Sequence, residues 1–346
     1  MIHILRIIIV LVIFIITNSR LTAQEHTDSL RAVAEALKMI QFPEPQFNAP
    51  FSFEITQKGM EDMGFDQPYI SEVITLKMRD SVLIHGQNYT HDSNKTILLL
   101  HGTLATSFTY NKMSGLLREA VQANVIAVDL RGHGQSGGIP GDVSTLNQYA
   151  EDLDDMISAI KKQRPNDTII LAGHSMGGGI VLRHAETFPK TKVDAYLLFA
   201  PNLGNNAPTT SQVLNLKSNF IKTHLSRGLG LKMLNEFGIH TYDSMHVVFY
   251  NLPEQMPIKS YSYRSMQASF PEDYKKTLQS ISKPVLVLVG SNDEAFIAKE
   301  YAVVINSYSK GDYYMVEGET HNGIRHNAEA MTKIKNWVNN TKFNNQ

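Results

Sequence analysis

The chain has 346 residues, 42% of them apolar and 19% charged, which is enough apolar material to bury a sizeable core. Its 32 Lys and Arg residues nearly balance 33 Asp and Glu residues, so it lacks the basic excess that nucleic-acid binding requires. The absence of cysteine excludes disulfides, a thiolate nucleophile and thiolate-ligated zinc.

The first residues have the pattern of an export signal. A short, weakly basic start precedes an unbroken apolar run from Ile7 to Ile16, and small Ala23 follows a polar stretch. This pattern predicts a signal peptide over residues 1–23 and export to the periplasm or the medium. The run is shorter than the ~20 residues of a membrane-spanning helix. Apolar residues before the run extend it, so an uncleaved membrane anchor is the alternative.

Residues 24–70 form an N-terminal extension with no predicted function. A short helix is expected from Ser29 to Ile40. The segment from Phe42 to Pro50 contains three prolines and is expected to be a linker.

From Glu72 onward, apolar strand patterns alternate with amphipathic helix patterns. This alternation predicts an α/β fold with a mostly parallel, eight-stranded sheet and helices on both faces. The expected strands are 72–78, 82–89, 96–100, 125–128, 168–172, 193–199, 284–289 and 313–316. The first two are expected to form a hairpin.

The alternation is interrupted over residues 202–280, which are rich in Leu, Met, Phe and Tyr and mostly helical in pattern. A plain surface excursion would leave many apolar side chains in water, so a helical cap or a membrane-facing lid is favoured. The core is then divided into a first part, 71–201, and a second part, 281–346.

A G-x-S-x-G motif, Gly173 to Gly177, follows the apolar strand 168–172 and precedes an apolar helix. This context predicts a sharp turn that exposes Ser175 as a nucleophile, with small residues where side chains would collide. The N–H of Met176 lies at the start of the helix and is expected to bind an oxyanion.

A serine nucleophile requires a base, and in sheets carrying this motif the order along the chain is serine, acid, histidine. His321 follows the last strand and Asp293 follows the preceding one, so these are the expected base and acid. Glu294 is the alternative acid. Asp293 could instead cap a helix from residue 294 onward, and one side chain is not expected to do both.

A second oxyanion donor is expected in the loop after the strand 96–100. Gly102 allows close approach of the backbone, and the N–H of Thr103 is the candidate, with Leu104 as the alternative. Leu104 and His174 are also expected to contact substrate. The turn from Asp129 to Ser136 is expected to support loops through hydrogen bonds rather than to catalyse. The histidine spacing indicates no metal site.

Together, His101-Gly102, residues 129–136, Gly173–Gly177, residues 290–293 and His321 resemble the α/β-hydrolase superfamily. Within it, the chain looks like the serine aminopeptidase S33 and monoacylglycerol-lipase-like hydrolases. The resemblance implies cofactor-free hydrolysis of acyl esters or related bonds beneath a variable cap. Peptidase members would carry acidic cap residues that bind a substrate amine, for which the candidates here are Glu236, Asp243 and Glu254.

The sequence therefore predicts a serine hydrolase that cleaves carboxylic esters with a hydrophobic acyl group through an acyl-enzyme. Hydrolysis of an amide, thioester or carbon–carbon bond is the alternative reaction, and a non-catalytic ligand-binding protein is the alternative class. The expected partners are a small ester or lipid-like substrate and, through the cap, a membrane surface. No nucleic-acid partner is expected. The sequence does not indicate the oligomeric state.

Overall fold

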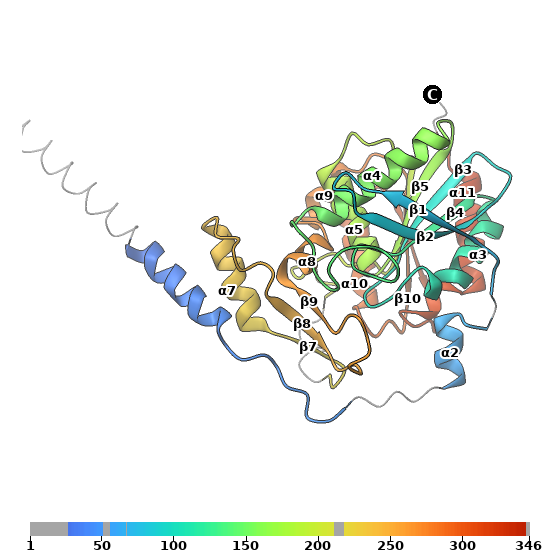
Figure 1. The fold of residues 1–346 in the computed structure, drawn as a ribbon. Helices are drawn as coiled ribbons and strands as arrows, with labels where there is room; N and C mark the ends of the chain where they lie inside the picture. The colour runs from blue at the N-terminus through green and yellow to red at the C-terminus, as the bar shows by residue number, and fades with distance from the viewer. Residues whose placement is uncertain (1–26, 51–55, 67, 211–217, 344–346) are drawn as a thin grey trace, which may run out of the picture.

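The computed structural model describes residues 27–50, 56–66, 68–210 and 218–343. The expected signal peptide, 1–23, lies outside these residues. The centre of the molecule is an eight-stranded sheet of order β1-β2-β4-β3-β5-β6-β10-β11 (Figure 1). Its strands are β1 (Glu72–Lys77), β2 (Leu83–Tyr89), β3 (Lys95–Leu100), β4 (Asn124–Val128), β5 (Thr168–His174), β6 (Ala195–Phe199), β10 (Val285–Gly290) and β11 (Asp312–Val316).

The sheet is mostly parallel, as the sequence predicts. Strands β1 and β2 form the expected antiparallel hairpin, and β2 is also antiparallel to β4. Every other neighbouring pair in the sheet is parallel. The prediction of an eight-stranded, mostly parallel sheet is therefore confirmed.

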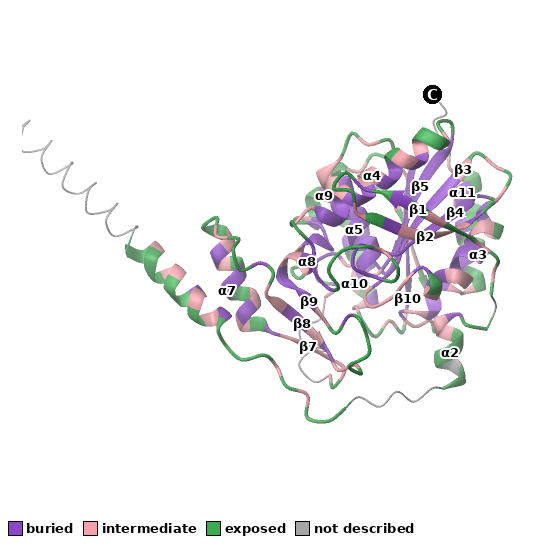
Figure 2. Ribbon diagram, in the orientation of Figure 1, coloured by how far each residue is buried: buried purple, intermediate pink, exposed green. Residues whose placement is uncertain are grey.

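Helices cover both faces of the sheet, because the central strands are apolar on both sides (Figure 2). Alternate residues of β3 illustrate this: Leu98 and Leu100 belong to one apolar cluster, and Ile97 and Leu99 belong to the other. Burial of each such side chain contributes about 1.5–3 kcal/mol. The core helices are α3 (Asn111–Val121), α4 (Gln148–Gln163), α5 (Met176–Thr187), α10 (Ala298–Tyr308) and α11 (Ala328–Asn340), with the 3₁₀ turns η1 (Phe108–Tyr110) and η2 (Gly323–Arg325).

Helices α4, α5 and α10 pack on the first face, whereas α3 and α11 pack on the second. Parallel strands bring their carboxyl ends to one edge of the sheet. The loops after β3, β5, β10 and β11, which carry the expected site residues, therefore meet at that edge.

The segment expected to be a helical cap also contains strands, which corrects the prediction. It holds a three-stranded antiparallel sheet, β7-β8-β9, together with α7 (Leu225–Glu236), α8 (Tyr263–Ala268) and α9 (Tyr274–Ser280). The strands are β7 (Ile221–Thr223), β8 (His246–Tyr250) and β9 (Ser260–Ser262). They are too short for a period-two pattern to stand out from a helical one. The boundaries 202 and 280 stay a prediction.

The N-terminal extension packs against this cap. A helix over residues 27–40 lies beside α7 (Figure 1). Gly230 allows the close approach, since a Cβ there would lie 2.8 Å from the carbonyl oxygen of Ala36. The linker continues the contact: Lys222 Nζ donates to Gln46 O at 2.6 Å, and Asn251 Nδ2 donates to Ala49 O at 2.8 Å. Before the sheet, α2 (Gln57–Met63) ends near η2.

Within the described residues, none of the helices combines the length and apolar character needed to cross a bilayer.

A buried histidine on α5 makes the fold sensitive to acid. His184 is 1% exposed, and neither ring nitrogen has a hydrogen-bond partner among the described residues; the nearest carboxylate oxygen, Asp154 Oδ1, is 3.5 Å away. Burial lowers the pKa of His184 to about 4. The folded pKa lies below the unfolded value of about 6.5, so the unfolded chain takes up the proton more easily than the folded one. The free energy of unfolding is therefore highest above pH 6.5 and decreases as the pH falls toward 4.

Lowering the pH from 7 to 5 should therefore remove about 2 kcal/mol of unfolding free energy through His184. Urea unfolding at pH 7, 6 and 5 measures this loss. The variant His184→Leu, which cannot take up the proton, should lose less stability over the same range. An equal loss in His184→Leu and the parent would rule out this histidine as the cause.

Candidate active site

Ser175 lies on a sharp turn between β5 and α5. Its backbone angles are φ 54° and ψ −119°, a conformation that costs a non-glycine residue about 1–3 kcal/mol. The glycines of the motif make the turn possible. A Cβ on Gly173 would lie 2.4 Å from the carbonyl oxygen of Gly177, and a Cβ on Gly177 would lie 2.3 Å from that of Leu100.

Backbone hydrogen bonds hold this strained turn in place. The Ser175 N–H donates to Phe199 O at 2.9 Å, and the Ser175 carbonyl accepts from Gly179 N at 3.1 Å and Asn202 N at 3.0 Å. Two of these partners belong to the neighbouring strand β6 and the loop after it. The half-buried Ser175 side chain is thus fixed at the carboxyl edge of the sheet, where substrates of such sheets bind.

His321 and Asp293 form a direct pair. His321 Nδ1 lies 2.8 Å from Asp293 Oδ2, and the side chains are 10% and 0% exposed. A carboxylate only accepts hydrogen bonds, so Nδ1 carries the proton and Nε2 is left as the acceptor of a neutral ring. Phe296 packs against the same ring with centroids 5.4 Å apart.

Asp293 also closes a turn with its second oxygen, but it does not cap a helix, so the alternative role as a helix cap is not observed. Oδ1 accepts from the N–H groups of Ala295 and Phe296, each at 2.8 Å, and α10 begins later, at Ala298. Glu294 has a separate role: its Oε2 accepts from the His321 backbone N–H at 2.9 Å. The geometry therefore assigns the imidazole partner to Asp293 and not to Glu294.

Ser175 and His321 are brought together through His174. The rings of His174 and His321 have centroids 4.5 Å apart, and His174 directly precedes Ser175. Among the described residues, no hydrogen bond joins Ser175 Oγ to His321. In enzymes without substrate, such bonds are often long or misaligned.

His174 is 2% exposed and uses both ring nitrogens within the protein, so it has neither nitrogen to offer a substrate. The Gly102 N–H donates to Tyr110 Oη at 2.9 Å, and that hydroxyl lies 2.6 Å from His174 Nδ1. Nε2 lies 2.9 Å from the carbonyl oxygen of His321 and must donate to it. The tyrosine therefore donates to Nδ1, and the ring is neutral. Burial lowers the pKa of His174 well below its usual value, in agreement with this assignment.

The loop after β3 presents the backbone N–H of Thr103 without an acceptor among the described residues. Leu104, with φ 61°, donates its N–H to Tyr261 Oη at 3.0 Å. Within the described part of the chain, the Thr103 N–H has no acceptor. The first N–H of α5, on Met176, has no partner one turn earlier in its helix. Thr103 and Met176 are thus the better pair of candidate donors, and Leu104 is the weaker alternative.

The turn after β4 supports loops, as expected. Asp129 Oδ1 accepts from Ser107 N at 2.7 Å and Oδ2 accepts from Gln135 N at 2.8 Å. Arg131 forms a buried ion pair with Asp152, with Nη2 2.6 Å from Oδ1. These contacts fix the loops around β3 and β4 without presenting a reactive group.

Sequence reasoning missed two tyrosines, Tyr110 and Tyr261, whose hydroxyls hold the loop after β3. Tyr110 lies only eight residues after Gly102, so its place in the same loop was a usable signal. Tyr261 is 157 residues from Leu104 in the chain, and no local pattern connects them.

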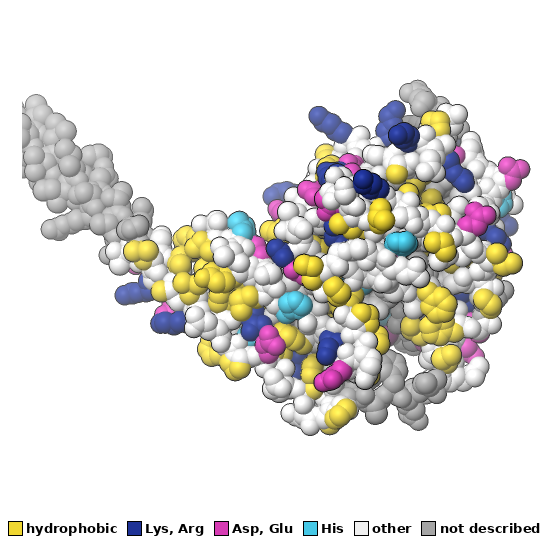
Figure 3. Space-filling view, viewed as in Figure 1, with side chains coloured by type: hydrophobic (Ala, Val, Ile, Leu, Met, Phe, Trp, Pro, Cys, Tyr) yellow, Lys and Arg dark blue, Asp and Glu magenta, His cyan; other side chains and the backbone are white. Residues whose placement is uncertain are grey.

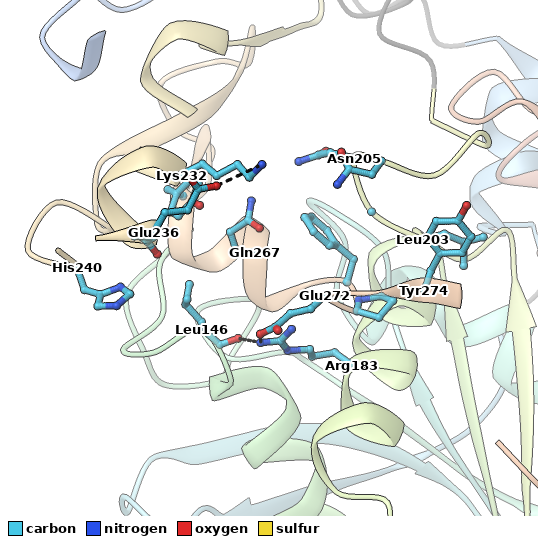
Figure 4. A pocket seen from close by; sticks show the side chains of 16 residues that line it. Leu146, Arg183, Leu203, Asn205, Lys232, Glu236, His240, Gln267, Glu272 and Tyr274 are labelled. Carbon is cyan, nitrogen blue, oxygen red and sulfur yellow. Dashed lines mark hydrogen bonds and ion pairs between the residues drawn. The ribbon is translucent and has the colours of Figure 1, made fainter. Parts of the chain in front are cut away.

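A cavity of about 450 Å³ lies apart from these residues, between α7 and the core (Figure 4). Arg183 of α5 and Glu272 line its floor, paired at 2.8 Å, and Lys232 and Glu236 line the α7 side. Ser175, Asp293 and His321 do not line it. Across the described residues, no group of three or more His, Asp or Glu side chains is placed to hold a metal ion.

The chain matches known proteins in both sequence and fold. The serine aminopeptidase S33 family matches residues 91–321, more than half of the chain. An uncharacterized protein of Mycobacterium tuberculosis is 38% identical over 106 residues, 31% of this chain and 29% of the relative. The monoacylglycerol lipase of Mycolicibacterium smegmatis is 32% identical over 98 residues, 28% of this chain and 35% of the lipase. The chain thus spans about a third of the length of these curated relatives.

Solved structures agree on the fold. The esterase of Pyrococcus furiosus superposes with a TM-score of 0.55 at 17% identity, covering 86% of this chain and 98% of the esterase. A complex of the protein DcsB with its substrate analogue gives a TM-score of 0.59 at 16% identity, covering 78% of this chain and 98% of DcsB. The predicted α/β-hydrolase fold is confirmed, and the chain belongs to the serine aminopeptidase S33 family.

Proposed function

We propose that the protein is a serine hydrolase of carboxylic esters with a hydrophobic acyl group. The observation that carries the proposal is the buried pair of His321 and Asp293, 2.8 Å apart, beside the strained turn of Ser175. This arrangement supplies a nucleophile, a base in the required tautomer and a group that orients the base.

The proposed reaction has two acyl-transfer steps. Ser175 Oγ attacks the ester carbonyl carbon while His321 Nε2 takes its proton, and the N–H groups of Met176 and Thr103 bind the oxyanion. His321 then gives the proton to the departing alcohol as the carbon–oxygen bond breaks. Water attacks the acyl-enzyme by the same route and releases the acid. A single oxyanion donor is worth about 3 kcal/mol of barrier.

The cap favours an ester over a peptide with a free amine. Asp243 is buried and already accepts from Asn235 Nδ2 at 2.6 Å and from His240 Nδ1 at 3.0 Å. Glu236 lies 3.7 Å from Lys232 and faces the separate cavity. Two of the three acidic candidates are therefore not placed to hold a substrate amine beside Ser175. The third, Glu254, is exposed on the segment between β8 and β9. The monoacylglycerol lipase among the relatives also supports an apolar ester.

Replacing Ser175 with Ala should lower hydrolysis of p-nitrophenyl esters by at least about 10³-fold, since the nucleophile is lost. The same change should abolish labelling by a fluorophosphonate probe. Ser158→Ala, at an exposed position on α4, is the matched control and should keep both properties. Full activity in the Ser175→Ala variant would refute the assignment of Ser175 as the nucleophile. A parent protein that binds ligand but is not labelled would favour a binding protein.

The type of bond that is cleaved needs a separate measurement. Activity on a panel of esters, thioesters and aminoacyl amides distinguishes the ester from the alternative bonds.

Replacing Asp293 with Asn should lower kcat by roughly 10³–10⁴-fold, because the amide group can donate to Nδ1 and leave the proton on Nε2. Glu294→Gln, which keeps an oxygen for the His321 N–H, is the control and should cost less than about tenfold. The measurement is kcat on one ester, with thermal unfolding as a folding check. Equal losses in the two folded variants would contradict the assignment of Asp293 as the acid.

We also propose that the cap contacts a membrane surface. Large apolar side chains gather over α7 and the helix 27–40 (Figure 3), among them Leu30, Leu225 and Leu229, 59%, 51% and 53% exposed. Such a patch is typical of an interaction surface.

We further propose that the chain is exported. If export proceeds by signal cleavage, the mature chain purified from a bacterial host should begin at Gln24. N-terminal sequencing checks this directly. A charged residue at the cleavage site, Ala23→Asp, should block processing. Recovery of the uncleaved parent chain in the membrane fraction would instead support the anchored form.

A further inference from the structure

We propose that Tyr261, a residue of the cap, is a positioning residue for the oxyanion hole, so that the cap itself completes the site. This inference rests on the proposed function. Its basis is a chain of buried hydrogen bonds that starts at Leu104, next to the candidate donor Thr103, and ends in the loop after β4.

The direction of each hydrogen bond in this chain follows from its partners. His133 Nδ1 lies 3.0 Å from the carbonyl oxygen of Arg131 and therefore donates to it. In a neutral ring Nε2 is then an acceptor, and it lies 2.8 Å from Tyr261 Oη, which donates its proton. The Tyr261 oxygen is left to accept from the Leu104 N–H at 3.0 Å. Each donor and acceptor in this hydrogen-bond chain therefore has one possible partner.

The phenol and the imidazole of this hydrogen-bond chain are buried and tightly packed. Tyr261 is 0% exposed and His133 is 2% exposed, and their rings stack with centroids 5.8 Å apart. Burial lowers the pKa of His133 to about 4, which keeps the ring neutral. A Leu104 N–H that lost the phenol of Tyr261 would lose its acceptor, and an unpaired N–H in a partly buried position is costly.

The hydrogen bond from Leu104 stabilises a turn that its own backbone disfavours. Leu104 has φ 61°, a conformation that L-residues other than glycine rarely adopt, and it is the third residue of a turn closed by Ala105 N and Gly102 O at 3.4 Å. The first residue of the turn, Gly102, is held through its N–H by Tyr110. With the N–H groups on both sides held inward by tyrosines, the one between them, on Thr103, is left to face a ligand.

Tyr261 also connects this turn to the position of the cap. It is the central residue of β9, and the next residue, Ser262, donates its N–H to Gly141 O at 2.9 Å and its hydroxyl to Asp142 Oδ1 at 2.5 Å. Arg264 pairs with the same carboxylate. These bonds fasten β9 to the core beside the turn. A displaced cap would therefore withdraw the phenol and release Leu104.

The test is Tyr261→Phe, which keeps the ring and removes only the hydroxyl. We expect kcat on a p-nitrophenyl ester to fall about tenfold or more while KM changes less than about threefold, since the oxyanion forms only in the transition state. Binding of a trifluoromethyl ketone, which forms an oxyanion adduct with serine, should weaken in parallel. Tyr263→Phe is the control: it removes a cap phenol two residues away, whose hydroxyl has no hydrogen-bond partner among the described residues, and kcat should stay within twofold.

His133→Asn provides a second variant that leaves Tyr261 in place. It should lower kcat in the parent but change kcat less than twofold in the Tyr261→Phe background, because both changes act through the same hydrogen-bond chain. Unchanged kcat in folded Tyr261→Phe, or independent effects of the two changes, would overturn the proposal while fluorophosphonate still labels Ser175. Loss of that labelling in the parent would instead refute the proposed function.

Discussion

The backbone at Ser175 is the constraint on which the site depends. A serine with φ 54° is unfavourable in isolation and persists only because its surroundings over-determine it. Phe199, Gly179 and Asn202 fix its backbone, and glycines remove the side chains that would force it open. At the same turn the His174 side chain is buried in the core, whereas the Ser175 side chain lies at the edge of the sheet. One strained residue thus fixes both the candidate nucleophile and the start of the histidine network next to it.

Buried neutral histidines give that network its direction. His101, His133 and His174 are each at most 2% exposed, and burial lowers the pKa of all three. A neutral ring has one donor and one acceptor, so each histidine can join two loops in only one sense. His101 illustrates this, accepting from Leu130 N at 3.0 Å through Nε2 and donating to Gly102 O through Nδ1. Charged rings would lose an acceptor and separate these loops.

The sequence was sufficient wherever a signal was local or repeated along the chain. The buried strands, the turn at Ser175 and the order of Ser175, Asp293 and His321 all leave short, recognisable patterns. The short strands of the cap were missed because three to five residues do not establish a period. The turn closed by Asp293 and the phenol of Tyr261 were missed because they depend on which oxygen faces which neighbour in three dimensions.

The N-terminal extension has a structural role that its sequence did not suggest. Arg227 of α7 donates to Ile40 O at 3.3 Å and to His246 O at 2.8 Å, so one buried guanidinium joins the extension to strand β8. Strand β8 in turn pairs with β9, which carries Tyr261. The extension therefore braces the same small sheet whose tyrosine holds Leu104. In this arrangement the order of the candidate oxyanion loop depends in part on Arg227 and on the extension residues that it holds.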